Sequence, residues 1–290
     1  MAASLPYDPA FDLCGAEPNT LRRRYAEAAP AARREDRSDQ SAKLTKIVEA
    51  EIIPRLMVLH ARPEAATSPD VGPELIEKFA YYSISEPPTS LLAIVGGLLQ
   101  RGVSLDSVYL DVLGPAARRL GEMWSDDTLS YADVTIALGR LQHVVRELSV
   151  HGDPSFAASR GDRAALFAPA PGEQHTFGIV IVEEFFRRAG WRTWSELSGQ
   201  RQEVEAAVAA HHFDLFGVTA SSREKLDLIA PLIKSVRRTS RNRDITVLVG
   251  GLLFLEEPEL AATVGADGMA PDARDALLMA EGAVRQLTRR

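Results

Sequence analysis

The feature that most constrains the fold is an alternation in the second half of the chain, where each short apolar run is followed by an amphipathic segment. The apolar runs lie at 164–168, 193–197, 215–220, 245–249 and 269–270, and the amphipathic segments lie near 175–189, 200–211, 223–238, 256–264 and 273–288. A strand followed by a helix, repeated five times, is typical of a parallel sheet with right-handed crossovers. Because the runs are continuous rather than alternating, the strands are expected to be buried on both faces. Residues 163–290 are therefore predicted to form a doubly wound α/β domain with five parallel strands.

The preceding part of the chain has a helical period instead. Apolar residues recur at spacings of three and four in segments near 42–59, 72–84, 89–101, 105–124 and 130–150, with proline and glycine between them. This pattern predicts a helical bundle over residues 41–150. Residues 151–162 are polar and contain glycine and proline, so we interpret them as a linker between two domains.

The charge and cysteine content exclude several classes of protein. The 290 residues carry a net charge of −7, with 33 basic and 40 acidic side chains, which disfavours direct recognition of DNA. The single cysteine, Cys14, excludes an internal disulfide framework and suits a reducing compartment. Residues 1–40 mix proline, alanine and balanced charge, so this arm is expected to be disordered. Since there is neither a long apolar stretch nor a signal-peptide pattern, we expect a cytoplasmic protein without a membrane anchor.

The loop after the first predicted strand carries a histidine with a carboxylate two residues before it. In open α/β sheets ligands bind beyond the carboxyl ends of the strands, so Glu173 and His175 lie where a site is expected. A metal-binding histidine usually donates its second ring N–H to a carboxylate, and these two residues could form that pair. The alternative is that Glu173 caps the following helix while His175 faces solvent. The glycine-rich motifs that bind dinucleotides and nucleoside triphosphates are absent from this loop.

Small residues follow two further strands. Residues 217–222 combine glycine and alanine with three hydroxyl side chains, and Gly250-Gly251 follows the fourth strand. Glycines at a strand end let another group approach the backbone closely, although turn and cap chemistry explains each loop equally well when it is taken alone. Together the three loops indicate a slot lined by small residues beside a histidine that could bind a metal.

These loops resemble those of the cobalamin-binding Rossmann-like domains of the methionine synthase and mutase type, which carry D-x-H-x-x-G, S-x-L and G-G. The counterparts in this chain are the loop of Glu173, His175, Thr176, Phe177 and Gly178, then Thr219 and Ser221, and finally Gly250 and Gly251. The resemblance implies that His175 is the lower cobalt ligand and that the displaced nucleotide tail enters between Thr219, Ser221 and the two glycines. It also implies that Gly178 lets the helix pass close to the corrin. Glutamate in place of aspartate at position 173 lengthens the side chain by one methylene. Thr-x-Ser in place of Ser-x-Leu at positions 219–221 makes the slot more polar.

The helical half is similar to the four-helix cap that precedes such domains and covers the upper face of the corrin. The resemblance implies that Trp124 is an aromatic lid, whereas helical spacing alone also suits a tryptophan packed between helices. Light-sensing cobalamin repressors carry Glu-His where this chain has Val134 and Thr135. His143 is a substitute if it lies on the right helical face, and otherwise it is a partly buried polar residue of the bundle.

The run from Trp124 to Thr135 and the loop of His175 with its helix together resemble the AerR/PpaA family of antirepressors of photosynthesis genes. The resemblance spans roughly residues 90–290 and implies a cobalamin-dependent response to light or oxygen, with adenosyl- or hydroxocobalamin as the cofactor. The implied partner is a DNA-binding repressor of the CrtJ/PpsR type. No reaction module is apparent, which favours a regulator over an enzyme. Two alternatives are a haem-binding sensor of the same fold and a corrinoid carrier subunit of a methyltransferase.

Overall fold

The structure is a computed structural model that describes residues 71–150 and 162–287. The chain divides into two compact units, and the division falls between Leu141 and Gln142. The predicted arm at 1–40, the predicted helix at 42–59 and all but the last residue of the predicted linker at 151–162 lie outside the described residues. Within the described ranges no helix combines the length and the apolarity that crossing a bilayer requires.

The described helical region contains the four remaining helices that the sequence predicts. They are α4 (Pro73–Ser85), α5 (Pro88–Gln100), a continuous stretch made of α6 (Leu105–Ser107), η3 (Val108–Leu113) and α7 (Gly114–Ser125), and then α8 (Tyr131–Val150). Pro73 and Pro88 begin their helices at positions where a missing N–H costs nothing. The η3 segment is a π-helix that ends two residues before Pro115, which cannot donate a hydrogen bond to the preceding turn.

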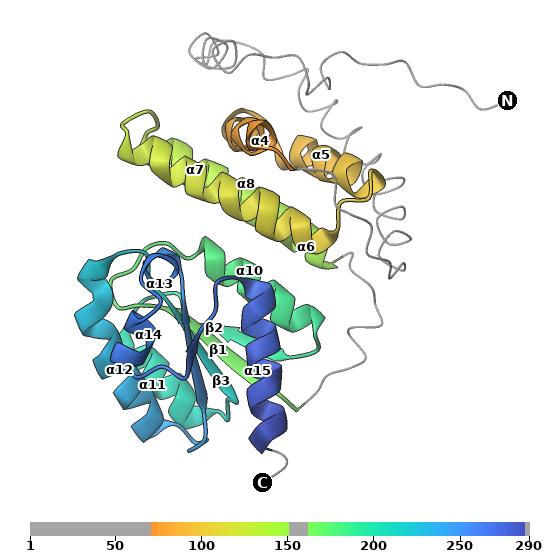
Figure 1. Cartoon of the computed structure of the whole chain (residues 1–290). Coiled ribbons are helices and arrows are strands. Elements are labelled where there is room, and N and C mark those ends of the chain that lie inside the picture. The colour runs from red at the N-terminus through yellow and green to blue at the C-terminus, as the bar shows by residue number, and fades with distance from the viewer. Residues whose placement is uncertain (1–70, 151–161, 288–290) are drawn as a thin grey trace, which may run out of the picture. The chain divides into compact units, whose positions relative to one another are not determined.

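The second unit is a five-stranded parallel sheet with helices on both faces (Figure 1). Along the chain the elements are β1 (Ala164–Pro169), α10 (Phe177–Arg188), β2 (Arg192–Ser195), α11 (Arg201–Ala210), β3 (Leu215–Thr219), η4 (Arg223–Lys225), α12 (Leu226–Thr239), β4 (Thr246–Gly250), α13 (Leu252–Glu256), α14 (Leu260–Thr263), β5 (Gly268–Met269) and α15 (Ala273–Leu287). The strand order is β2-β1-β3-β4-β5, which confirms the predicted doubly wound α/β fold.

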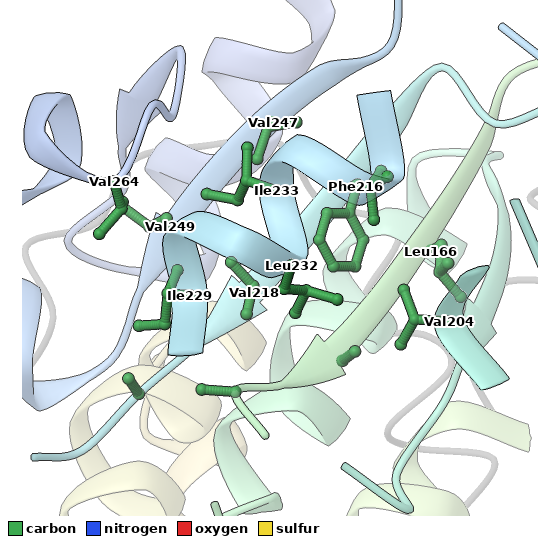
Figure 2. Close-up of a cluster of buried hydrophobic side chains, with 14 of the residues drawn as sticks. Leu166, Val204, Phe216, Val218, Ile229, Leu232, Ile233, Val247, Val249 and Val264 are labelled. Carbon is green, nitrogen blue, oxygen red and sulfur yellow. The ribbon is translucent and has the colours of Figure 1, made fainter. Parts of the chain in front are cut away.

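Two separate cores fix this sheet between its helices. One cluster packs the sheet against α11, α12, α13 and α14, and it includes Leu166, Phe216, Ile229 and Val264 (Figure 2). The other packs the opposite face against α10 and α15, and its members include Phe167 and Phe186. Both faces of β1, β3 and β4 are therefore covered, which explains why their sequences are apolar without alternation.

Two local predictions are wrong. The strand at β2 is not buried on both faces, because β2 lies at the edge of the sheet and its residues alternate between exposed and half-buried. The single helix predicted at 256–264 is two short helices, α13 and α14, which begin directly after Gly251 and are interrupted at Pro258. A proline inside a helix removes a donor and its ring clashes with the preceding turn.

The central position of Phe216 makes it a test of the fold. Its side chain is fully buried in the first cluster (Figure 2), so Phe216→Ala should lower the free energy of unfolding by about 3–5 kcal/mol. The exposed Leu228 on α12 is the matched control, since Leu228→Ala should change it by only about 0.5 kcal/mol. Urea denaturation followed by circular dichroism measures both values. Similar losses in the two variants would contradict the assignment of Phe216 to the core.

Candidate functional site

The loops after β1 and β3 meet at the point where the order of the strands in the sheet reverses. β1 pairs with β2 on one side and with β3 on the other. The helix that follows β1 packs on one face of the sheet, and the helix that follows β3 packs on the other. The two loops therefore leave the sheet toward opposite faces, which is where doubly wound folds bind their ligands.

The loop after β1 is held by backbone contacts on both sides. The N–H of Ala170 donates to the carbonyl of Thr219 at 2.8 Å, and the N–H of Glu173 donates to the carbonyl of Ala170 at 2.8 Å. Gly172 has a φ of +76°, which glycine adopts without strain. A Cβ at Gly199 would lie 3.5 Å from the N of Gly172, so the loop after β2 also packs closely here. Neither Gly172 nor Gly199 was among the predicted site residues, although the Pro171-Gly172 pair is a turn signal in the sequence.

Glu173 is the centre of the site. Its side chain is only 3% exposed, and its two carboxylate oxygens accept five hydrogen bonds. Oε1 accepts from the N–H groups of Gln174 at 2.8 Å and His175 at 2.9 Å, and from Nδ1 of His175 at 2.6 Å. Oε2 accepts from the N–H of Ser221 at 2.7 Å and from its Oγ at 2.5 Å. One buried carboxylate therefore joins the two loops and fixes the imidazole.

The hydrogen bonds determine which forms of these groups are stable. Burial of the Glu173 carboxylate disfavours its charge, but the hydrogen bonds from His175 and Ser221 outweigh that effect and hold its pKa well below the ordinary range. The hydrogen bond to Glu173 raises the pKa of His175 above 6.5, against the opposing effect of partial burial. Glu173 is therefore an anion, and it holds a proton on Nδ1 of His175.

His175 offers its other ring nitrogen to a ligand. The side chain is 65% exposed, and among the described residues Nε2 has no hydrogen-bond partner. Ser221 Oγ lies 3.1 Å from Nδ1, so two groups restrain the inner edge of the ring. An imidazole whose Nδ1 proton is held by a carboxylate is oriented with its Nε2 lone pair outward, which is the usual arrangement of a metal-binding histidine. The site therefore suits a metal that takes one ligand from this loop.

The residues after His175 lead into α10. Thr176 is the residue before the helix, and its carbonyl accepts from the N–H of Ile179 at 3.0 Å. Phe177 is buried in the domain. Gly178 is exposed, and a Cβ added there would meet nothing within 4 Å. The helix surface at Gly178 is thus open to a bulky neighbour.

Thr219, Ser221 and the two glycines have different surroundings. The Oγ1 of Thr219 is buried and has no hydrogen-bond partner in the described part of the chain, whereas the hydroxyl of Ser221 is engaged by Glu173. Gly251 has a φ of +94°, and a Cβ there would lie 2.4 Å from the carbonyl oxygen of Ala220. A Cβ at Gly250 would lie 3.2 Å from the carbonyl oxygen of Ala270. The protein backbone itself therefore approaches both glycines, and Thr219 presents the unsatisfied polar atom.

Trp124 and His143 belong to the helical region. Trp124 is the penultimate residue of α7 with 41% of its surface exposed, and its ring meets that of Tyr131 edge to face, with the ring centroids 6.3 Å apart. It is therefore not one of the buried core residues of the helical unit. His143 is 47% exposed and its Nε2 lies 3.7 Å from Glu147 Oε1, which suits the alternative of a partly buried polar residue on α8.

Comparisons with known proteins point to one class. Residues 163–278 match the model of the B12-binding domain. The chain is 30% identical over 167 residues to an uncharacterised 20.5 kDa protein in the bchF-crtJ intergenic region of Rhodobacter capsulatus, covering 57% of this chain and 85% of that protein. The monomethylamine corrinoid protein of Methanosarcina barkeri has a similar fold, with a TM-score of 0.57 and 14% identity, over 72% of this chain and 98% of the other.

The Glu173–His175 contact predicts a pH dependence in the metal-free protein. Because the contact raises the pKa of His175 in the folded protein, it stabilises the fold fully below pH 6.5. This stabilisation is lost as the pH rises through the raised pKa of His175. Glu173→Gln should therefore lower the pKa of His175, as measured by NMR titration of the ring protons. Glu203→Gln on the exposed face of α11 is the control. An unchanged midpoint in the Glu173 variant would contradict the proposed origin of the shift.

Proposed function

This chain belongs to the AerR/PpaA-type family of B12-binding proteins, and from that premise we propose that it is a cobalamin-dependent, light- or oxygen-responsive antirepressor. The observation that carries the proposal is the exposed His175 imidazole, held by a buried Glu173 at 2.6 Å within a B12-binding domain. The proposed partner is a DNA-binding repressor of the CrtJ/PpsR type. The position of the Rhodobacter relative beside crtJ supports this choice of partner.

The residues of the site fit a corrinoid. His175 would hold the cobalt through Nε2, in the base-off, His-on mode, because Nδ1 is committed to Glu173. Thr219 fits the displaced nucleotide tail, since its buried hydroxyl lacks a partner among the described residues and a ligand atom would satisfy it. The open surface at Gly178 fits the edge of the macrocycle. Adenosyl- and hydroxocobalamin are the proposed forms.

The proposed mechanism depends on two parts of the chain. Bound adenosylcobalamin would supply a cobalt–carbon bond that light can break. Glu173 and Ser221 keep His175 in one orientation, in which its Nε2 would hold the cofactor. Trp124 of the helical region, whose ring is exposed, is the proposed aromatic lid. The response would alter the surface that the repressor recognises, which makes the protein a two-state regulator without a reaction of its own.

Removing the lower ligand tests the cofactor proposal. The full chain should acquire a cobalamin absorption spectrum on reconstitution, and His175→Ala should shift that spectrum and weaken binding. Glu173→Gln should weaken cobalamin binding by about 10–100-fold, as loss of a supporting hydrogen bond does in other metal sites. His212→Ala removes an exposed histidine of the same domain and should leave the spectrum unchanged. A wild-type spectrum in His175→Ala would contradict His-on binding, and a haem spectrum without cobalamin binding would favour the haem sensor.

Illumination tests the regulatory proposal. Protein reconstituted with adenosylcobalamin in darkness should change both its spectrum and its affinity for the repressor when it is illuminated. Trp124→Ala should reduce the change in affinity severalfold. Trp194→Ala removes a tryptophan of similar exposure, 46% against 41%, on β2 of the other unit and is the matched control. An affinity that is identical in light and darkness, together with methyl transfer to a partner enzyme, would instead support a corrinoid carrier.

A further inference from the structure

Two neighbouring rows of residues lie on the face of the sheet that packs against α10 and α15. Residues two apart on a strand share a face and are separated by about 6.6 Å. Pro169, Thr219 and Gly250 are paired across β1, β3 and β4, close to the carboxyl ends. Phe167 and Gly217 are paired one row deeper in the sheet. Any group that passes over Thr219 toward the middle of the sheet therefore reaches Gly217 next.

The space over Gly217 is filled by the ring of Phe167. A Cβ at Gly217 would lie 2.6 Å from Cδ1 and 2.9 Å from Cε1 of Phe167, so the ring lies across the neighbouring strand. Phe167 is 4% exposed, and its ring meets that of Phe186 on α10 edge to face at 5.0 Å. The glycine in β3 is therefore explained by the ring beside it. Gly217 lies inside β3 rather than in the loop that follows it.

The row of Pro169, Thr219 and Gly250, next to this ring, contains a hydroxyl group without a hydrogen-bond partner among the described residues. The Oγ1 of Thr219 is buried without a partner among the described residues, and Gly250 beside it contributes no side chain. Under the proposed function this is where the nucleotide tail would lie. A tail that satisfies Thr219 and continues along the same face meets the edge of the Phe167 ring.

We propose that Phe167 is a specificity-determining residue that closes the tail site directly beyond Thr219. This inference rests on the proposed function. The ring is close-packed against Phe186 and over Gly217, so moving it aside costs these packing contacts. The free energy gained by burying the base of the nucleotide tail is offset by the free energy lost with these packing contacts. The chain consequently binds corrinoids with little discrimination between complete and truncated tails.

Binding of two corrinoids tests this inference. Cobalamin carries the full nucleotide tail and cobinamide lacks it, so the ratio of the cobinamide Kd to the cobalamin Kd measures the contribution of the tail. Absorption titrations of the full chain should give a ratio within about threefold of one. Phe167→Leu should raise the ratio about tenfold through tighter cobalamin binding, with the cobinamide Kd unchanged. Phe216→Leu, which shortens a buried ring on the opposite face of the sheet, should leave the ratio unchanged.

The outcomes separate this inference from the function on which it rests. Binding of both corrinoids with a ratio that stays the same or falls in Phe167→Leu overturns the role of Phe167 alone. Failure of the wild-type chain to bind either corrinoid overturns the proposed function and this inference with it. Thermal melting verifies that the variants are folded. If Phe167→Leu is unfolded, Phe167→Met takes its place, because a flexible side chain of similar volume preserves packing and should shift the ratio in the same direction.

Discussion

The site depends on one buried carboxylate. A charge removed from water is costly unless donors surround it, and Glu173 is surrounded by five hydrogen bonds from its own loop, from His175 and from Ser221. The loop after β1 and the loop after β3 are therefore not independent of each other. Each supplies donors that the same anion needs, so the orientation of His175 is fixed by Ser221, 46 positions further along the chain, as well as by its own neighbours.

The parallel sheet makes this arrangement possible. Glu173 can reach Ser221 because β1 and β3 are paired and end at the same edge of the sheet, with Pro169 opposite Thr219. The close approach of the loop after β4 to the loop after β3 in turn requires a residue without a side chain at position 251. Gly251 lies against the carbonyl of Ala220, and Gly199 lies against the turn at Gly172. These two glycines support the position of the site through the contacts of their own backbone.

The fold and part of the site could be predicted from the sequence, because they depend on interactions between residues that are close together along the chain. The five strands follow from local hydrophobic runs, and the Glu173–His175 contact joins residues two apart, so both were predictable. The bond from Ser221 to Glu173 depends on strand register, which the runs do not specify. The alternation of exposed and half-buried residues along β2 depends on the place of this strand at the sheet edge. The two short helices at 252–256 and 260–263 depend on Gly251 and Pro258. The packing of Phe167 over Gly217 likewise requires knowledge of which strands are neighbours.

The choice of glutamate over aspartate at position 173 then acquires a structural reason. The additional methylene extends the carboxylate by about 1.5 Å, which lets one oxygen accept from the local N–H groups and Nδ1 while the other reaches Ser221. A shorter side chain starting from the same backbone would satisfy fewer of these donors at once. Serine at position 221 is the complementary feature, because its hydroxyl and its N–H together satisfy the second oxygen. The two departures from the D-x-H and S-x-L pattern therefore compensate each other, and the longer carboxylate is matched by a hydroxyl on the neighbouring loop.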